Sequence, residues 1–297
     1  MSIKPCSPFR LRVSNTRRED TVPRTMEGDV PMTTRPEPCN PPSPSLERHV
    51  FPGLSRVPGL VHGIFKRHGG VSLPPYAALN VAWDNGDNPR FVHENLSRIE
   101  KDLGLDCLAA GRQVHGDRIL LVDENALGRA ETRGHLVITP PGDALVTRLR
   151  GVGLLIKIAD CQAVFLVDPV QNVVANVHCG WRGSVQELPA KVVRFLRDRL
   201  GCRPEDLLAA VSPSLGPCCA EFRNYRTELP ASFAAYQAAP LHFDFWAVTR
   251  RQLEEAGVRP DRIEIAQVCT VCESRDYFSY RGEKVTGRNA AVIGWQA

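Results

Sequence analysis

The stretch between residues 143 and 178 most constrains what this chain can fold into. It contains four apolar runs of strand length, DALVT, VGLLIKIA, AVFLVD and NVVANVH, which follow one another with only short gaps. A crossover between parallel neighbours needs about a dozen residues or more, so these gaps exclude a helix between consecutive strands. The sequence therefore predicts an α+β fold, in which a single domain with a complex mixed sheet carries flanking helices, and not a simple doubly wound sheet.

Longer segments with helical periodicity lie outside this stretch. Residues 93–104 place their apolar side chains on one helix face and end on a glycine, and residues 243–257 also read as a helix. Residues 184–200 predict a third helix with Ser184 as its N-cap. Pro189 requires that this helix begins late or bends. These segments are the expected flanking helices.

The first 48 residues differ in texture from the rest. They hold nine of the 24 prolines, many of them in RPEPCNPPSPS, and show no sustained apolar period. Such a segment cannot bury enough apolar surface to offset the entropy lost on ordering. We therefore expect a disordered, proline-rich extension over residues 1–48, followed by one folded domain over residues 49–297.

Charge and hydropathy argue against two classes of partner. The net charge of +4 is spread along the chain and forms no basic block, so no nucleic-acid partner is expected. No run approaches the roughly 20 apolar residues of a membrane helix, and the first residues lack the apolar core of a secretory signal. We expect a cytoplasmic protein with no membrane partner, in which cysteines serve as core, metal-binding or catalytic residues.

Three residues at predicted strand ends could share a metal ion. They are His115 in RQVHGDRI, Cys161 in KIADCQAV and His178 in NVHCGWRG. Two histidines and one cysteine form a known catalytic zinc set that leaves a fourth position open. Their wide separation does not identify a site, and each residue alone also fits a hydrogen-bonded histidine or a small packed cysteine. The residues by themselves leave both interpretations open.

An anion site is the second candidate. Arg182 lies between two glycines in GWRG, beside Trp181 and ahead of a predicted helix. A guanidinium fork next to free backbone N–H groups suits a phosphate or a carboxylate. The same residues would also fit a structural role, in which Trp181 packs in the core and Arg182 forms a surface ion pair. Arg67 in FKRHGG and Asn80 in AALN are, taken alone, consistent with turns.

Four further cysteines occur as two close pairs. Cys218 and Cys219 lie in SLGPCC, and Cys269 and Cys272 lie in CTVC. A C-x-x-C pair can hold zinc or act as a redox pair, but no thioredoxin-like frame surrounds this one and no second C-x-x-C follows. Because vicinal cysteines rarely chelate one tetrahedral ion well, the sequence disfavours a zinc site made of all four.

Eight stretches together resemble one family in continuous order, over about residues 51 to 295. The family is that of the multicopper polyphenol oxidases (laccase-domain proteins), better described as purine nucleoside phosphorylases. The stretches are VHGIFKRHGGVSLPPYAALNVAWDNGDNP, RQVHGDRI, GDALVT, GVGLLIKIADCQAVFLVDP, NVHCGWRGSV, SLGPCC, FDFWAVTRRQL and CTVCESRDYFSYRGEKVTGRNAAVI.

The resemblance has implications for metal, reaction and fold. It implies that His115, Cys161 and His178 bind one zinc ion and serve catalysis, within a single complex α+β domain. It implies phosphorolysis of adenosine, inosine and methylthioadenosine, which converts these purine nucleosides and phosphate to the free base and a ribose 1-phosphate, together with deamination of adenosine. Similar chains have been interpreted as copper-dependent polyphenol oxidases, and close relatives as a peptidoglycan editing factor that hydrolyses a mis-made cell-wall precursor.

The chemistry of the donor set favours zinc over copper. A set of two histidines and one cysteine with an open position suits a Lewis acid or a source of hydroxide at neutral pH, which deamination requires. Multicopper oxidation needs several copper sites, whereas the chain has eight histidines and no H-x-H pair. We expect zinc as the cofactor, with copper as the alternative.

The remaining candidate residues concern the substrate. Phosphorolysis needs a cationic pocket, for which Arg67 and Arg182 are the candidates. Asn80 and Gln113 are candidates to hydrogen-bond the ribose or the base. Asp160 is a candidate general acid or base, or a residue that orients a ligand histidine.

The chain also departs from the family pattern. Cys179 replaces the usual small residue after the zinc-site histidine, and on a continuing strand its side chain points away from that of His178, so we expect a packed thiol. The family ending is shortened but keeps Arg281, Thr286 and Arg288, which we expect to close the pocket.

Two other functions stay open at this point. One is an amidase-like editing hydrolase that uses the same zinc site, or Cys161 as a nucleophile, on a nucleotide-linked muropeptide. The other is a non-catalytic metal-binding protein, for which a filled zinc site without turnover would be the evidence.

Overall fold

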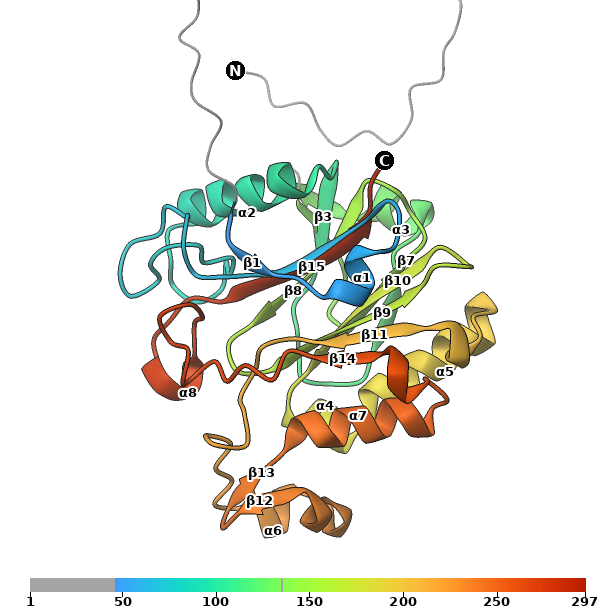
Figure 1. Ribbon diagram of the computed structural model, residues 1–297. Coiled ribbons are helices and arrows are strands. Elements are labelled where there is room, and N and C mark those ends of the chain that lie inside the picture. The colour runs from blue at the N-terminus through green and yellow to red at the C-terminus, as the bar shows by residue number, and fades with distance from the viewer. Residues whose placement is uncertain (1–45, 135) are drawn as a thin grey trace, which may run out of the picture. The chain divides into compact units, whose positions relative to one another are not determined.

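The computed structural model describes residues 46–134 and 136–297, and two β-sheets stacked face to face form its centre (Figure 1). The extension expected over residues 1–48 lies outside the described residues up to residue 45, and Arg48 already belongs to the first strand. No helix in the described part of the chain is long and apolar enough to cross a membrane.

The first sheet has seven strands in the order β1-β2-β15-β8-β3-β6-β5. Within it β8, β3 and β6 are parallel to one another, and β15 runs antiparallel to both β8 and β2. Its strands are β1 (Arg48–His49), β2 (Leu60–Phe65), β15 (Asn289–Trp295), β8 (Val152–Ile158), β3 (Cys107–Ala110), β6 (Leu136–Ile138) and β5 (Glu131–Arg133).

The second sheet has six strands in the order β14-β11-β9-β10-β7-β4 and is also mixed. Its strands are β14 (Ile263–Ile265), β11 (Leu208–Val211), β9 (Gln162–Asp168), β10 (Val173–Cys179), β7 (Ala144–Thr147) and β4 (Ile119–Leu121). The prediction of an α+β fold with mixed strands is confirmed. The four runs between residues 143 and 178 divide between the two sheets, because the chain crosses from one to the other at each end of β8.

The main core lies between the sheets. Leu154 and Ile156 of β8 face Phe165 of β9 and Val174 of β10, and all four side chains are buried. Burial of each such side chain stabilises the fold by roughly 1.5–3 kcal/mol. This apolar contact holds the sheets together and fixes how their ends meet.

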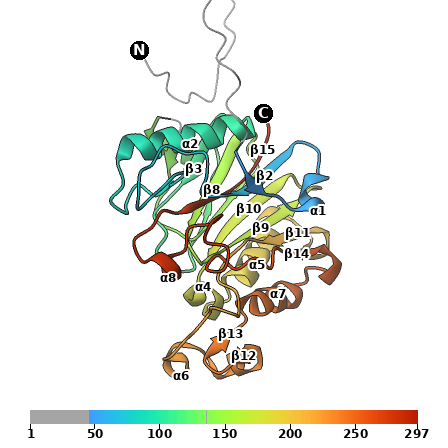
Figure 2. The same cartoon turned by 60° about the vertical axis from the view of Figure 1, so that its left-hand side comes forward.

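Helices cover the outer faces, as Figures 1 and 2 show. Helix α2 (Pro89–Leu103) packs on the seven-stranded sheet and ends at Gly104, whose φ of 64° suits glycine. Helices α5 (Leu188–Leu200) and α7 (Phe245–Glu255) pack on the six-stranded sheet. The three predicted helices are therefore present.

One detail of these helix predictions was wrong. Ser184 is not the N-cap of a helix, since it lies inside the short helix α4 (Trp181–Val185), which follows β10 directly. Its hydroxyl donates back to the Gly180 carbonyl, 3.4 Å away. The longer helix α5 begins late, as Pro189 requires, with Pro189 in its first turn.

Short elements complete the described chain. A two-stranded ribbon and helix α6 lie beyond α4 and α7 (Figures 1 and 2). The remaining elements are α1 (Pro52–Ser55), α3 (Glu124–Arg129), α6 (Tyr225–Glu228), α8 (Tyr280–Glu283), β12 (Gln237–Ala239), β13 (His242–Phe243) and 3-10 helices at Pro204–Asp206, Ala231–Tyr236 and Pro260–Arg262.

Three crossings between the sheets determine where function can be placed. The parallel strands β3, β6 and β8 of one sheet each lead into a strand of the other, namely β4, β7 and β9. These receiving strands are parallel to one another too, because β4 pairs parallel with β7 and both β7 and β9 run antiparallel to β10. All three crossings therefore lie at one end of the stacked sheets, where β10 also ends.

Candidate functional site

The three crossings and the end of β10 bring the sequence-predicted metal ligands together. His115 lies on the crossing from β3 to β4, Cys161 on the crossing from β8 to β9, and His178 near the end of β10. Their ligand atoms lie within 4.8 Å of one another, and the two imidazole rings are 4.7 Å apart between centroids. Residues far apart in sequence thus form one donor cluster, which we call the His-Cys-His cluster.

Gly180 leaves room beside this cluster. A Cβ atom at this position would lie 3.0 Å from the Cys161 sulfur and 3.1 Å from Nδ1 of His115. Contacts this short would push the donor atoms aside, so a glycine immediately after the β10 strand keeps the donors close to one another.

Asp143 orients two of the three donors. Its carboxylate accepts hydrogen bonds from the backbone N–H groups of His115 at 2.9 Å and Gly116 at 2.9 Å, and it lies 2.8 Å from Nδ1 of His178. A proton held at Nδ1 of His178 leaves Nε2 as the lone-pair donor of that ring. In the sequence, Asp143 is only an acidic residue at the start of the apolar run DALVT, and no motif singles it out.

The electrostatics of the cluster favour a positive charge. Burial alone would lower the pKa of His178, but the Cys161 sulfur and the Asp143 carboxylate outweigh it and raise the pKa to about 9. The pKa of His115 is lowered, first by burial and then by the neighbouring His178. Two imidazoles, a thiol and a buried carboxylate therefore create a place in which a cation is stabilised.

The backbone at the cluster is strained. His115 has a φ of 57° and Asp160 a φ of 84°, a region that costs a residue with a side chain roughly 1–3 kcal/mol. Hydrogen bonds to the Asp143 carboxylate hold the first turn, and the Asp160 carbonyl accepts from Leu215 N–H at 2.8 Å in the second. Strain that the surrounding structure maintains is characteristic of functional sites.

The Asp160 side chain holds neighbouring loops in place. Its carboxylate accepts hydrogen bonds from the Ser279 hydroxyl at 2.6 Å, the Thr270 hydroxyl at 2.8 Å and the backbone N–H of Arg281 at 2.6 Å. It is the Asp143 carboxylate, and not that of Asp160, that contacts His178, one of the metal-ligand candidates. Asp160 therefore holds Thr270 and the segment 279–281 against the crossing that carries Cys161.

Two adjoining cavities open beside the cluster. One has a volume of about 710 Å³ and is lined by His115 and His178 together with three cationic side chains, Lys157, Lys284 and Arg288. We call it the cationic pocket.

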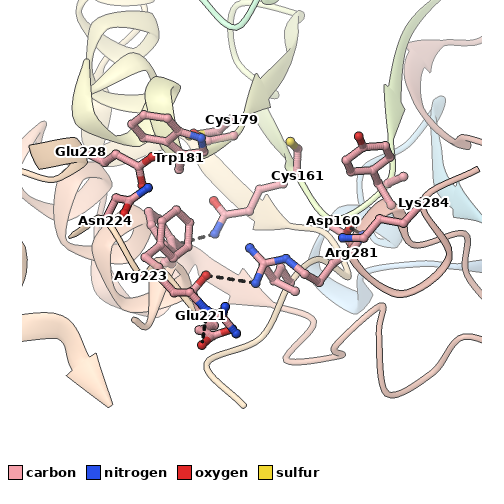
Figure 3. Close-up of a pocket in the computed structure, with 17 residues that line it drawn as sticks. Asp160, Cys161, Cys179, Trp181, Glu221, Arg223, Asn224, Glu228, Arg281 and Lys284 are labelled. Carbon is pink, nitrogen blue, oxygen red and sulfur yellow. Dashed lines mark hydrogen bonds and ion pairs between the residues drawn. The ribbon is translucent and has the colours of Figure 1, made fainter. Parts of the chain in front are cut away.

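The other cavity has a volume of about 350 Å³ and is lined by aromatic and charged side chains, some of which Figure 3 shows. We call it the aromatic pocket. Its aromatic side chains are Trp181, Phe222, Phe245 and Tyr280. Cys161, Trp181, Tyr280 and Lys284 line both cavities, so the pockets meet at the donor cluster.

Lys157 is the most constrained cation of the cationic pocket. It interrupts the apolar strand β8 and its side chain is only 7% exposed. Its ammonium lies 3.5 Å above the Trp83 ring and 3.6 Å from Oδ1 of Asp84, and makes no hydrogen bond within the described residues. Burial lowers its pKa, and Asp84 partly opposes this shift. A buried lysine without a hydrogen bond is ready to donate to an anion.

Two of the predicted substrate residues lie near the cluster. Gln113 lines the cationic pocket, where its amide donates to the Lys157 carbonyl at 2.8 Å and accepts from the Lys157 N–H at 2.9 Å. Arg182 is exposed and its guanidinium lies 4.8 Å from the centroid of the Trp181 ring. Gln113 thus holds Lys157 in place, whereas Arg182 lines neither cavity.

The other two predicted substrate residues stabilise neighbouring loops. The Arg67 guanidinium donates to Glu283 and to the Ser274 carbonyl, both at 2.7 Å. Asn80 is fully buried and its amide binds Asp87 at 2.8 Å and accepts from Arg288 N–H at 2.8 Å. Neither residue lines the two pockets. Both side chains thus bind neighbouring residues and do not face the cavities.

Two expectations about further residues can be compared with the structure. Cys179 is buried in the apolar core beside Ser184, and burial raises its pKa to about 12. It does not belong to the His-Cys-His cluster. The prediction of a packed thiol is therefore confirmed. Arg281, Thr286 and Arg288, expected to close the pocket, line the walls of the two cavities.

Comparison with known proteins places this geometry in a family. Residues 61–296 match the family model described as multi-copper polyphenol oxidoreductase laccase. A purine nucleoside phosphorylase of Deinococcus radiodurans is 36% identical over 258 residues, covering 82% of this chain and 94% of the relative. Purine nucleoside phosphorylase SCO2081 of Streptomyces coelicolor is 36% identical over 244 residues, covering 80% and 96%.

A solved structure has a similar fold. The crystal structure of YlmD from Geobacillus stearothermophilus superposes with a TM-score of 0.74 at 29% identity, covering 85% of this chain and 99% of that one.

Proposed function

Because this chain belongs to the multi-copper polyphenol oxidoreductase laccase family, we propose that it is a zinc-dependent purine nucleoside phosphorylase with adenosine deaminase activity. The observation that carries the proposal is the His-Cys-His cluster at the junction of a cationic and an aromatic pocket. A phosphorolytic enzyme needs places for phosphate, for a purine and for the reacting bond between them. The two pockets and the cluster supply these in one continuous site.

The donor set fits zinc. Two imidazoles and one thiolate, gathered within 4.8 Å, form a three-ligand set that leaves one position open. His115, Cys161 and His178 would hold the ion, and bound zinc would supply Lewis-acid polarisation of a substrate atom. Asp143 orients His178 and the turn that carries His115, as outer-shell carboxylates of such sites do.

Copper oxidation is a poorer fit. Within the described residues, two groups of three or more metal-competent side chains exist, and only the His-Cys-His cluster contains histidine. Several copper sites acting together would require more imidazole donors than these groups offer. The proposal therefore retains the phosphorylase names of the relatives rather than the oxidase name of the family model.

We place the phosphate in the cationic pocket. Lys157, Arg288 and Lys284 face one cavity, and hydrogen bonds to charged groups are the strong ones. Arg67 is less suited, because its guanidinium is already bound to Glu283 and Ser274. Arg182 is also less suited, because it is exposed and lines neither cavity.

We place the purine in the aromatic pocket. Trp181, Phe222 and Phe245 present apolar ring surface, on which a planar base can stack, and Arg281 lies 5.9 Å from the Phe222 ring. With the base there and the phosphate in the cationic pocket, the glycosidic bond lies near Cys161. For deamination, His115, Cys161 and His178 would hold the zinc ion, which would supply the Lewis acidity for replacement of the 6-amino group by water with release of ammonia.

Product analysis tests this proposal. Zinc-loaded protein is incubated with adenosine, inosine or methylthioadenosine, with and without phosphate. We expect phosphate-dependent release of the free base with ribose 1-phosphate from adenosine and inosine and with 5-methylthioribose 1-phosphate from methylthioadenosine. We also expect conversion of adenosine to inosine that does not require phosphate. The variant His178→Ala, which lacks one metal-ligand candidate, should leave all three nucleosides unchanged. A zinc-filled wild-type protein that did the same would overturn the proposal and favour a non-catalytic metal-binding protein.

A further inference from the structure

Four cysteines outside the His-Cys-His cluster gather at a second point. The sequence disfavoured a site made of all four, yet folding brings their sulfur atoms within 4.8 Å of one another. All four are free thiols. We call this group the four-cysteine cluster: Cys218, Cys219, Cys269 and Cys272.

Parallel pairing of two strands positions the cluster. β11 and β14 are parallel neighbours, and their backbone pairing continues past both strand ends. The Ser214 N–H donates to the Val268 carbonyl at 3.0 Å, and the Thr270 N–H donates to the Ser214 carbonyl at 3.0 Å. The two cysteine-bearing loops are therefore held side by side where the cysteines begin.

A turn allows the vicinal cysteines Cys218 and Cys219 to reach the same partner. On an extended strand, neighbouring side chains point to opposite faces. Here the chain turns over residues 217–219, and the Cys219 N–H donates to the Gly216 carbonyl at 2.9 Å. In this conformation both sulfurs approach the same partner, Cys272, at 3.6 Å from Cys218 and 3.7 Å from Cys219.

These separations match the edges of a metal-centred tetrahedron. Four sulfurs at about 2.3 Å from one zinc ion lie about 3.8 Å apart. The two sulfur separations above, 3.6 and 3.7 Å, agree with this value, and a single ion can reach every member of a group whose ligand atoms lie within 4.8 Å. Sulfur donors of this number and geometry select zinc or iron among the common metals.

The cluster lies at the boundary between the interior and the surface. Cys269 itself is buried, whereas Cys218 and Cys272 lie at the surface, from which an ion can enter.

We propose that the four-cysteine cluster binds a second zinc ion, as a closed site with a structural role. Four protein thiolates complete the tetrahedron and leave no position for substrate, in contrast to the His-Cys-His cluster. The site joins the loop after β11 to the loop after β14. This inference does not depend on the phosphorylase reaction.

The contacts of both loops show what the metal would stabilise. Thr270, between two of the cysteines, donates its hydroxyl to Asp160, which precedes the metal-ligand candidate Cys161. Arg281 donates to the Cys219 carbonyl at 3.3 Å and the Glu221 carbonyl at 3.0 Å, and both Arg281 and Glu221 line the aromatic pocket (Figure 3). A closed zinc site would thus fix the wall of that pocket from behind.

Metal analysis of the full chain tests the proposal. Protein produced with zinc and freed of loosely bound metal is analysed by plasma mass spectrometry, as wild type, Cys161→Ala and Cys272→Ser. We expect two zinc ions per chain in the wild type and one in each variant. Cys202→Ser, which changes a buried cysteine outside both clusters, is the matched control and should retain two.

X-ray absorption at the zinc edge provides a second measurement that does not require Cys272→Ser to fold. In the Cys161→Ala protein we expect all zinc to be bound by four sulfurs at about 2.3 Å, with no nitrogen ligand. Nitrogen ligation of that zinc, unchanged zinc content in Cys272→Ser, iron in place of zinc, or two disulfides detected by intact mass would each overturn the proposal. Failure of the phosphorylase assay would leave these measurements unaffected.

Discussion

The two donor clusters of this protein lie at the same end of the stacked sheets but are built differently. The His-Cys-His cluster forms where the chain crosses between sheets, offers three donors and borders two cavities. The four-cysteine cluster forms where two parallel strands of one sheet continue side by side, and offers four donors. Three donors leave a position for substrate, whereas four donors close the site.

This difference indicates that the surroundings of a cysteine decide its role more than its identity does. Cys161 follows a residue with strained backbone at a crossing and faces two pockets. Cys272 lies at the surface in a loop held by backbone pairing to its neighbour. We therefore expect changes at the first cluster to affect turnover strongly and changes at the second to affect stability with little effect on turnover. Four substitutions test this, ordered by their expected effect on turnover.

The largest effect is expected for Cys161→Ala. Without the thiolate, the open cluster loses its only anionic ligand and its zinc, and with it several kcal/mol of charge stabilisation in the transition state. Each 1.36 kcal/mol corresponds to about a tenfold change, so kcat/KM for inosine phosphorolysis should fall by about 10³ or more. The midpoint of thermal unfolding should fall as well, because loss of a bound ligand destabilises the folded state.

Cys202→Ser is the control for this substitution, since Cys202 is a buried cysteine outside both clusters. Its kcat/KM should equal that of the wild type. Retained turnover in a zinc-depleted Cys161→Ala protein would remove the open cluster from catalysis and end the distinction between the two clusters.

A smaller effect is expected for Asp143→Asn. The amide keeps the shape of the carboxylate but removes the charge that orients Nδ1 of His178. Loss of such a partner lowers metal affinity or activity by about 10–100-fold. Competition with a zinc chelator measures the affinity for zinc, and only one of the two zinc ions should be bound more weakly. Equal weakening of both would contradict a local role for Asp143.

Much of the fold could be predicted because apolar patterning was clear. The runs between residues 143 and 178 are buried strands, and the periodic segment 93–104 lies within α2. Their division between two sheets could not be predicted, since each crossing is only a few residues long and periodicity does not say which sheet a strand joins. Ser184 was misplaced for a related reason, because α4 begins directly after β10.

The site was predicted at the level of loops, and less well at the level of side chains. The motifs containing His115, Cys161 and His178 do converge, because parallel strands end together. Asp143 and Lys157 were missed, since each stands within or beside an apolar run and gives no spacing signal. Their roles depend on contacts across the sheets, as in the bond from His178 to Asp143.

Lys157→Met should affect turnover at the open His-Cys-His cluster without affecting the four-cysteine cluster. The methionine retains the length of the side chain above Trp83 but cannot donate to phosphate. A hydrogen bond to a charged group contributes roughly 1.5 kcal/mol, so the KM for phosphate should rise about tenfold while the zinc content stays at two. Initial rates at varied phosphate measure this. A changed KM for inosine with an unchanged KM for phosphate would place the anion elsewhere.

The smallest effect on turnover is expected for Cys272→Ser, because the four-cysteine cluster supports the aromatic pocket only from behind. kcat should change by less than about threefold. Stability should respond instead: a ligand present at about 1,000 times its Kd stabilises the folded state by about 4 kcal/mol, which corresponds to a fall on the order of 10 °C in the unfolding midpoint when it is lost. Differential scanning calorimetry of the wild type and Cys272→Ser measures this fall, and initial rates compare the turnover of Cys272→Ser with that of Cys161→Ala. If Cys272→Ser lost turnover as completely as Cys161→Ala, or unfolded at the wild-type midpoint, the open and the closed donor cluster would not have different roles in this protein.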